Sequence, residues 1–230
     1  MNSMKTRRVQ KKMALMLFGG SLLLLTACDV AKTVASEYGI NIPEGTQSVQ
    51  TSTPITTGPA IVNTGFENDA AGWKIVGDAQ GGYIEPNYMK SGGVSNGYIY
   101  AKDDVAGGVW YFAAPSSYLG NKSNYFGTTL RYSLFQRITG SANPFENKDV
   151  IFKSGDRMIY FQMNKTEHPR SAWTHYAVQI KANSGWKNQN GNIATEAEMR
   201  NVLSNVTEFW IRGEFQTGAD EGGLDNVRIN

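Results

Sequence analysis

Cysteine is the residue that this sequence most nearly lacks: the 230 residues include only one, Cys28. A single thiol cannot form an intramolecular disulfide, which excludes a disulfide framework. Two histidines and no second cysteine also argue against a zinc site, which needs three or four such ligands. No glycine-rich phosphate loop or dinucleotide fingerprint opens a helix, so the sequence gives no sign of nucleotide binding.

Long apolar runs are scarce as well. The run from Met13 to Leu25 carries no charge, but it is shorter than the roughly 20 residues that a membrane-spanning helix needs. Basic residues precede it and small residues follow it, which is the order of a secretory signal. We therefore predict a signal peptide over residues 1–27. The basic residues are Lys5, Arg7, Arg8, Lys11 and Lys12.

The end of this segment, Leu25-Thr26-Ala27-Cys28, resembles the bacterial lipoprotein signal motif. The resemblance implies that Cys28 becomes the new N-terminus and carries fatty acid such as palmitate. Each buried CH₂ contributes about 0.8 kcal/mol, so several acyl chains would hold the protein at a membrane. The alternative is a short membrane anchor with a free cysteine. We expect a lipid-anchored protein of the bacterial cell envelope, with the choice between inner and outer membrane left open.

Removing the signal changes the charge balance. The full chain has 22 basic and 20 acidic residues, and the signal carries five of the basic ones and no acidic one. The mature chain then has 17 basic and 20 acidic residues, a net charge of −3. Because nucleic-acid binding depends on neutralising phosphates, this balance argues against a nucleic-acid partner.

The mature chain divides into two parts. Residues 28–59 are dominated after Ile42 by Thr, Ser, Gln, Gly and Pro, which cannot bury enough apolar surface to fold alone. We predict a lipidated cysteine followed by a flexible tether with a reach of about 30 Å. Residues 60–230 have the length of one domain.

The pattern of residues 60–230 is that of short strands separated by Gly, Asn, Asp and Ser turns. In residues 207–215, Phe209, Ile211 and Phe215 fall on one face, while Glu208, Arg212 and Glu214 fall on the other. Nine such runs predict an all-β jelly-roll β-sandwich. The runs are WKIV, GYIYA, VWYFA, TLRYSLF, VIFKS, MIYFQM, HYAVQI, EFWIRGEF and LDNVRI.

One short helix is predicted in the C-terminal third. Thr195-Glu196-Ala197-Glu198 has the form of a capping box, in which the Thr hydroxyl and the Glu carboxylate bind free amides at a helix start. Val202, Leu203 and Val206 follow and are available for burial.

The sequence contains no convincing set of catalytic residues. Gly93-Val94-Ser95-Asn96-Gly97 matches a nucleophile elbow, but a strand-like run follows it where the elbow requires a helix. Asp103 and Asp104 are adjacent, and neighbouring residues of a strand point to opposite faces. A surface turn explains them better than a glycosidase pair. We predict no catalytic residue and a protein that is not an enzyme.

Oxygen-rich stretches lie at both ends of the domain. Glu67 and Asp69 stand in TGFENDAAGW, and Asp220, Glu221 and Asp225 in TGADEGGLDNV. Pairing of the first and last strands would bring these stretches together. Calcium takes six to eight oxygen ligands, some of them backbone carbonyls. The alternative is a pair of acidic, glycine-rich turns without metal.

Six stretches from Asn63 onward share a family pattern: the opening Gly65-Phe66-Glu67 with Trp73, GGVWYFAAPSSYLGN, YFGTTLRYSL, WTHYAVQI with Trp186, EMRNVLSNVTEFWIRGEF and GLDNV. With them the chain resembles a laminin B (domain IV) module, an all-β jelly roll related to galactose-binding-like and carbohydrate-binding domains. The resemblance implies a structural calcium held by Glu67 and Asp225, with carbonyls near residues 90–92 as helpers.

Aromatic residues in polar loops are candidates for ligand stacking, with polar neighbours to fix orientation. They are Trp186, Tyr83 and Tyr88. A packing role for Trp186 is the alternative, because its position belongs to the family pattern. The other tryptophans lie in strand-like runs and are predicted to be core: Trp73, Trp110, Trp173 and Trp210.

Three functions are consistent with these observations. The first is an envelope lipoprotein that displays a non-catalytic binding module for a glycan or a matrix-like protein. The second is a polysaccharide hydrolase or lyase using carboxylates such as Asp103, Asp104 or Glu167. The third is a structural envelope protein that binds other subunits. We take the first as the prediction.

Overall fold

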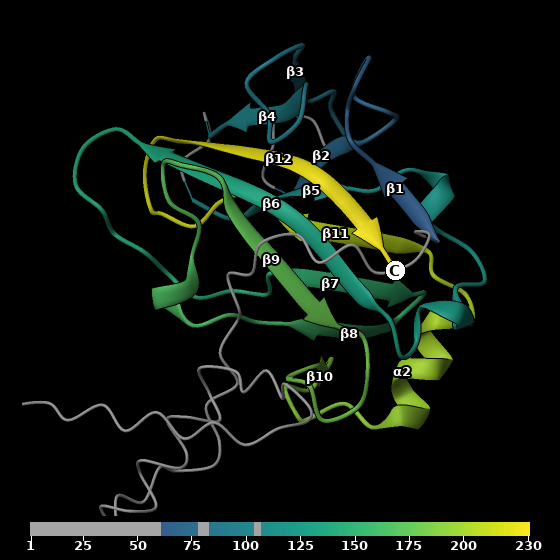
Figure 1. Ribbon diagram of the computed structural model, residues 1–230. Coiled ribbons are helices and arrows are strands. Elements are labelled where there is room, and N and C mark those ends of the chain that lie inside the picture. The colour runs from purple at the N-terminus through teal and green to yellow at the C-terminus, as the bar shows by residue number, and fades with distance from the viewer. Residues whose placement is uncertain (1–60, 78–82, 104–106) are drawn as a thin grey trace, which may run out of the picture. The chain divides into compact units, whose positions relative to one another are not determined.

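A computed structural model describes residues 61–77, 83–103 and 107–230. The predicted signal peptide, Cys28, the tether and Asp104 lie outside these residues. The described residues form a jelly-roll sandwich of two antiparallel sheets with one α-helix (Figure 1), as the sequence predicted. No helix within them is both long and apolar enough to cross a membrane.

The first sheet, called sheet I, faces the viewer in Figure 1. Its strand order is β3-β4-β12-β6-β9, and β1 also pairs with β12. Since β6 occupies one edge of β12, β4 and β1 follow each other along the opposite edge. The strands are β1 (Val62–Thr64), β3 (Asn87–Met89), β4 (Tyr98–Lys102), β6 (Thr129–Ile138), β9 (Thr174–Gln179) and β12 (Asp220–Ile229).

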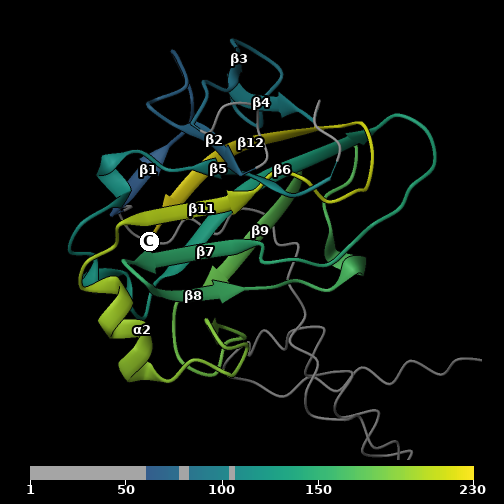
Figure 2. The ribbon, with the colours of Figure 1, turned by 180° about the vertical axis from the view of Figure 1, so that it is seen from behind.

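The second sheet, called sheet II, is nearer the viewer in Figure 2 and has the order β10-β8-β7-β11-β5-β2. Its strands are β2 (Lys74–Gly77), β5 (Trp110–Ala113), β7 (Val150–Ser154), β8 (Arg157–Phe161), β10 (Lys187–Asn188) and β11 (Glu208–Arg212). Short 3₁₀ turns occupy three connections: η1 (Ser116–Tyr118), η2 (Ser123–Tyr125) and η3 (Lys165–Glu167). The short strands β1, β3 and β10 were not among the nine predicted.

Helix α2 (Glu196–Leu203) confirms the predicted capping box. The Thr195 hydroxyl accepts a hydrogen bond from the Glu198 amide at 3.2 Å, and Glu198 Oε2 accepts one from the Thr195 amide at 2.8 Å. Val202 and Leu203 are buried, and the helix packs against β7 and β8. A cap of this kind contributes about 1 kcal/mol, and burial of the apolar face fixes the helix on the sandwich.

The core lies between the sheets and is rich in aromatic residues. Trp73 contacts Tyr118 and Phe209 edge to face, with ring centroids 5.3 and 6.1 Å apart. Phe152 stacks on Phe209 at 4.5 Å. Each fully buried apolar side chain contributes about 1.5–3 kcal/mol, so this layer supplies most of the driving force. As predicted, Phe209, Ile211 and Phe215 belong to it.

The face of residues 207–215 that carries the polar side chains is covered at Arg212 and Glu214, whereas Glu208 and Trp210 stay partly exposed. Arg212 and Glu214 are 0% and 4% exposed. Arg212 Nη1 donates to Asp149 Oδ1 at 3.1 Å, and its guanidinium lies between the rings of Phe145 and Phe215. Sheet II thus buries a charged residue at the end of β11 by giving it a carboxylate and two aromatic rings.

Candidate functional site

The outer face of sheet I carries the candidate site. Successive side chains of a strand point to opposite faces, and Ile99, Leu134 and Leu224 are in the core. The residues that alternate with them therefore point outward. The cross-strand register arranges them in rows: Tyr98, Asp225, Ser133 and His175 come first, then Tyr100, Gly223 and Phe135, then Lys102, Glu221 and Arg137.

Four rings of this face make one group, called the aromatic cluster: Tyr98, Tyr100, Phe135 and Trp173. Trp173 precedes β9, and its ring centroid lies 4.8 Å from that of Phe135 and 5.3 Å from that of Tyr98. Tyr98 lies 5.9 Å from Tyr100. Phe135 and Tyr98 are buried, whereas Tyr100 and Trp173 stay partly exposed. The two partly exposed rings are therefore supported from beneath by two buried ones.

Gly223 explains how Phe135 lies over the sheet. A Cβ at Gly223 would lie 2.1 Å from a ring carbon of Phe135, a distance at which the ring could not stay. Glycine at this position of β12 leaves the space that the ring occupies. The aromatic cluster therefore requires glycine at position 223.

The third row places charge beside the rings. Arg137 Nη1 lies 2.8 Å from Glu221 Oε1, and Lys102 Nζ lies 3.9 Å from Glu221 Oε2. The Arg137 guanidinium lies 4.2 Å from the centroid of Phe135. Such surface ion pairs contribute at most about 1 kcal/mol to stability. Their effect here is to hold Arg137 against the aromatic cluster.

A hollow of about 470 Å³ lies next to Arg137, where β6 extends beyond its pairing with β9. There the backbone amide of Gln136 donates to Arg170 O at 2.8 Å, and Arg170 belongs to the connection before β9 and not to a strand. We call it the arginine hollow. Its lining residues are Gln136, Arg137, Ile138, Pro169, Arg170, Ser171 and Gln216. Gln136 is 4% exposed, and neither polar atom of its side chain has a protein partner.

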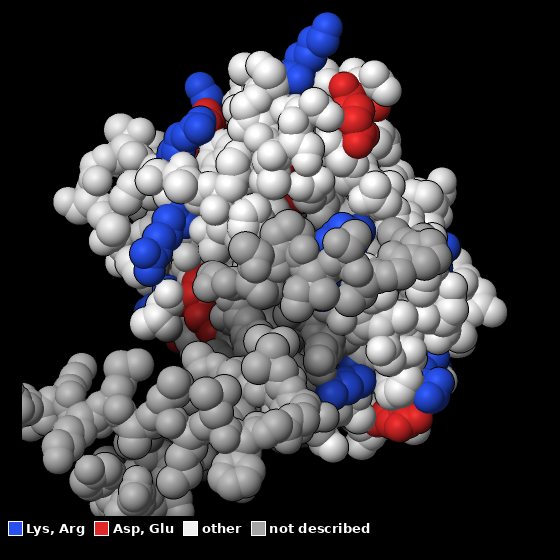
Figure 3. All heavy atoms as spheres, in the orientation of Figure 1, with Lys and Arg blue, Asp and Glu red and all other residues white. Residues whose placement is uncertain are grey.

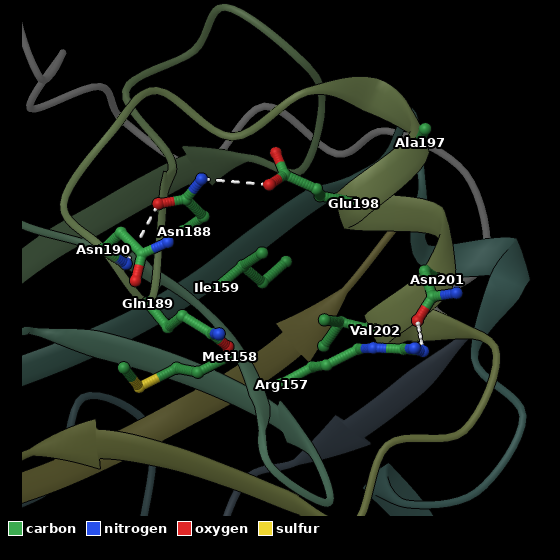
Figure 4. A pocket seen from close by; sticks show the side chains of 10 residues that line it. All are labelled: Arg157, Met158, Ile159, Asn188, Gln189, Asn190, Ala197, Glu198, Asn201 and Val202. Atoms are coloured by element: carbon green, nitrogen blue, oxygen red, sulfur yellow. Dashed lines mark hydrogen bonds between the residues drawn. The ribbon is translucent and has the colours of Figure 1, made fainter.

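A second hollow, of about 360 Å³, lies between β8, the turn after β10 and α2 (Figure 4). Its polar groups bind one another: Arg157 Nη1 donates to Asn201 Oδ1 at 2.5 Å, and Asn188 Nδ2 donates to Glu198 Oε1 at 2.9 Å. These bonds connect the helix to its neighbouring strands. We therefore interpret this hollow as a structural contact between α2 and the strands β8 and β10.

Asp225 stands at the gap between β4 and β1 along the edge of β12. The strand bulges there, and Asn226 adopts φ of +52°. Asp225 Oδ2 accepts from the Val94 amide and Oδ1 from the Asn226 amide, both at 2.6 Å. Burial raises the pKa of Asp225 to about 6, the backbone amides oppose that rise, and the nearby charge of Glu67 adds to it.

The loop of residues 90–97 crosses this part of the outer face. Besides the bond from Val94, Gly92 O accepts from the Trp173 indole at 3.0 Å. The loop leads into β4 and not into a helix, in agreement with the rejection of a nucleophile elbow at Ser95. It fixes the orientation of Trp173 and lies against Asp225.

Asp225 and Glu67 are the residues for which the sequence predicts calcium. The first and last strands do pair, a condition that the sequence left open, and the charge of Glu67 affects the pKa of Asp225. A Cβ at Gly93 would lie 2.7 Å from Asp225 Oδ2 and 2.4 and 2.9 Å from two carbonyl oxygens, of Gly97 and Asn96, so oxygens converge there. Within the described residues no three His, Cys, Asp or Glu side chains are grouped to hold a metal. A calcium ion here would depend on two carboxylates and on carbonyls.

The structure does not bring the three predicted stacking residues together. Trp186 is 1% exposed, packs against Phe152 and donates its indole proton to Gln179 O at 2.8 Å. A ligand-stacking role for it is wrong, because a ring inside the sandwich cannot reach a ligand. Tyr83 is 63% exposed but precedes Ile84, which bridges to β2 of sheet II. Tyr88 packs against the core, and its hydroxyl donates to Glu67 O at 3.1 Å.

Of the four tryptophans predicted in the core, Trp73 and Trp110 are there. Trp173 and Trp210 are partly exposed, so that prediction is wrong for both. Trp210 lies on the outer face of sheet II, 5.6 Å from Tyr111, with Lys153 Nζ 3.7 Å from its centroid. The signal for Trp173 was present: it has the same parity as His175, while Tyr176 and Val178 are the buried residues of β9.

Carboxylates near the other end of the sandwich are buried or used in the fold. Asp103 donates its backbone amide to Asp220 O at 2.9 Å. Burial, together with the charges of Glu214 and Asp103, raises the pKa of Asp220 to about 8. Glu167 Oε2 accepts from the Asn164 amide at 3.1 Å in the cap of η3. Ser133 Oγ lies 2.8 Å from His175 Nδ1, a contact that the sequence did not reveal, but Ser133 is only 3% exposed.

The comparisons with known proteins agree with this fold. The laminin B (domain IV) family model matches residues 111–230. The basement membrane proteoglycan of Caenorhabditis elegans is 24% identical over 128 residues, which are 55% of this chain and only 4% of that protein.

Two solved structures are also similar. The L4b domain of human laminin alpha-2 superposes with a TM-score of 0.56 and 13% identity, covering 75% of this chain and 98% of that one. A family 11 carbohydrate-binding module from Clostridium thermocellum, solved with a β-1,3-1,4-mixed-linked tetrasaccharide, has a TM-score of 0.45 and 12% identity over 72% of this chain and 92% of that one. The latter likeness is too weak to inform about a ligand. By the match over more than half of its length, the chain belongs to the laminin B (domain IV) family.

Proposed function

We propose that this chain is a non-catalytic binding module that holds a glycan on the outer face of sheet I. The observation that carries the proposal is the aromatic cluster. Tyr100 and Trp173 present partly exposed rings on a sheet face, and two buried rings fix their orientation. Sugar rings offer apolar faces to such side chains, and a preformed site loses little conformational entropy on binding.

The polar neighbours suit the same ligand. Lys102, Glu221 and Arg137 lie one register step away from the rings, and the arginine hollow continues beyond them. Hydroxyl groups of a glycan can donate to the carboxylate and accept from the basic groups. A face with rings and hydrogen-bonding groups side by side favours an extended, polar ligand.

Binding without catalysis is favoured by the state of the candidate catalytic groups. Of the carboxylates considered for a hydrolase, Glu167 serves in the cap of η3, Asp103 is partly exposed and Asp104 lies outside the described residues. Asp220 and Glu214, which lie at the same end, are nearly fully buried. The hydroxyl of Ser133 is covered, so its contact with His175 does not offer a nucleophile to a polymer. A hydrolase of glycans needs two accessible carboxyl groups that flank the scissile bond.

The binding experiment uses the full chain in detergent on a glycan array, followed by titration with each glycan that binds. We expect Trp173→Ala and Tyr100→Ala to weaken binding at least tenfold, which corresponds to about 1.4 kcal/mol. Trp210→Ala is the matched control, since it removes an equally large, partly exposed ring from the opposite sheet. Equal losses in Trp210→Ala and Trp173→Ala, or release of product with time, would refute the proposal. Binding of an envelope protein in place of any glycan would support the structural role instead.

We also propose that lipid on Cys28 carries the module at the bacterial cell envelope. The basic stretch, the short apolar core and the motif before Cys28 support this. Metabolic labelling with radioactive palmitate should label the chain, and Cys28→Ser should remove the label and move the protein into the soluble fraction. A labelled Cys28→Ser protein would contradict the anchor.

Calcium at Asp225 and Glu67 is a further part of the proposal, in which the ion would fasten the end of β12 to the loop of residues 90–97. We expect millimolar calcium to raise the melting temperature at pH 7.5, since a ligand present at 100 times its Kd stabilises the folded state by about 2.7 kcal/mol. The rise should be smaller at pH 5. Asp225, whose pKa is raised to about 6, is mostly protonated at that pH, and calcium binds the ionised carboxylate.

The two acidic residues of the opening turn provide the control pair for calcium. Both Glu67 and Asp69 are exposed, and Asp69 accepts a bond from the Ala71 amide at 2.7 Å. Glu67→Gln should reduce the calcium-dependent rise, and Asp69→Asn should leave it intact. A melting curve that is the same in chelator and in calcium would dismiss the site.

A further inference from the structure

The arginine hollow has a positive lining. Two arginines line it, and none of its seven lining residues is acidic. Glu221 neutralises Arg137, but within the described residues Arg170 makes no ion pair and is exposed. Figure 3 shows basic side chains along the left margin of this face, over the end where β6 finishes and β12 begins. The domain therefore offers an uncompensated cation at one end of the aromatic cluster, although the mature chain has a net negative charge.

Gln136 adds a buried amide that lacks a partner. Both polar atoms of its side chain are without a protein hydrogen bond, and the residue is 4% exposed. A buried polar group left unsatisfied is costly, and native proteins usually pair it with water or a ligand. The Gln136 side chain lies on the same side of β6 as the core residue Leu134, so it is enclosed behind the hollow and does not itself face a bound glycan. The neighbouring Gln216 already accepts from the Asn143 amide at 2.8 Å, so that side chain is fixed.

The hollow is continuous with the aromatic cluster. Arg137 lies over Phe135 at 4.2 Å, and Phe135 contacts Trp173 at 4.8 Å. Trp173 follows Arg170 by three residues in the same connection. A glycan that stacks on Trp173 can therefore place its next unit at Arg170. The volume of about 470 Å³ falls in the range of small-molecule sites, about 300–1,000 Å³.

We propose that the arginine hollow binds the carboxylate of an acidic sugar unit, so that the glycan held by this module is a uronate-containing one. This inference rests on the proposed function and names its ligand class. The free guanidinium of Arg170 can bind a planar carboxylate through two parallel hydrogen bonds. The aromatic cluster binds the ring face of the preceding unit.

The test compares polygalacturonate with its fully methyl-esterified form, using the full chain in detergent and a calcium-free buffer. The two polymers share one backbone, and the ester removes only the charge. We expect the acid form to bind at least tenfold more tightly, and Arg170→Gln to abolish that difference. Arg157→Gln is the matched control, because Arg157 lines the other hollow and is bound to Asn201. A third titration uses heparin, in which most of the negative charge is carried by sulfate groups.

Each outcome bears on the inference separately from the proposed function. Equal affinity for the two polymers, or an equal loss in Arg157→Gln and Arg170→Gln, overturns the inference. Tighter binding of heparin than of polygalacturonate overturns the carboxylate assignment. Binding of a neutral glycan that depends on Trp173, with no preference for the acid form, overturns the inference and leaves the proposed function standing. Absence of binding to any glycan refutes both.

Discussion

The buried ion pair between Arg212 and Asp149 gives a sharp prediction about stability. Both side chains are at most 1% exposed. Arg212 Nη2 also donates to Phe145 O at 2.9 Å, and Asp149 Oδ2 accepts from the Met163 amide at 2.5 Å. Burial raises the pKa of Asp149 to about 6, so the pair is ionised at pH 7.5. Asp149→Asn removes the charge with little change of volume, and it replaces one of the two acceptor oxygens by an NH2 donor.

The expected loss of unfolding free energy depends on the buried charge that remains in each variant. Asp149→Asn leaves a cation at 0% exposure without a counter-charge, which costs about 3–5 kcal/mol of unfolding free energy. The double variant Asp149→Leu with Arg212→Met removes both charges and keeps similar volume. It loses only the bonds to Phe145 O and the Met163 amide, each about 1 kcal/mol. We therefore expect the double variant to cost about 2 kcal/mol, less than either single change.

Urea denaturation at pH 7.5, followed by tryptophan fluorescence, measures these free energies. Glu196→Ala is the control, because the Glu196–Arg200 pair is more than half exposed and should contribute under about 0.5 kcal/mol. A loss below 1 kcal/mol in Asp149→Asn, or a double variant that costs the sum of the single changes, would refute the reasoning about an uncompensated buried charge.

Three further predictions follow from packing and titration. Trp186→Ala should lower the free energy of unfolding, measured in urea, by about 3–5 kcal/mol, and Trp173→Ala should lower it by under about 1 kcal/mol. Similar losses in the two variants would contradict the placement of Trp186 in the core and Trp173 at the surface. Gly213→Ala should cost about 1–3 kcal/mol and alter the near-ultraviolet circular dichroism, because its Cβ would lie 1.8 Å from the Trp110 ring; an unchanged spectrum would argue against that contact. Asp220 has its pKa raised to about 8 by burial, so the folded state binds the extra proton and stability should fall as pH rises from about 4 to 8. Between pH 6.5 and 8 that fall should be absent in Asp220→Asn, and urea midpoints across this range give the comparison.

Several features followed directly from the sequence because they depend on neighbouring residues. The capping box at Thr195 needs a hydroxyl and a carboxylate three positions apart, and the sequence shows both. Strands that alternate or run apolar between glycine and asparagine turns were found, and their number indicated a jelly roll. The short strands β1, β3 and β10 were missed because two or three residues leave no period to detect.

The candidate site was harder to predict because side-chain exposure in a sandwich depends on what covers each face. Trp186 stands in a polar loop, yet tertiary packing turns it into the core beside Phe152. Tyr98 and Tyr100 alternate with Ile99 and Ala101, so every residue of that run is apolar and the outward face cannot be chosen from the pattern. Arg212 is charged by type, and its burial depends on Asp149, which lies just before β7, the neighbour of β11 in sheet II.

The sequence by itself determined the fold class, the helix that follows Thr195 and the family. These depend on local periodicity and on short motifs. Only the tertiary structure decided which rings form the aromatic cluster, which arginine stays free and where the hollow opens. Those properties arise from the register of five strands that are distant in the sequence, and register is set by the packing of the whole sandwich.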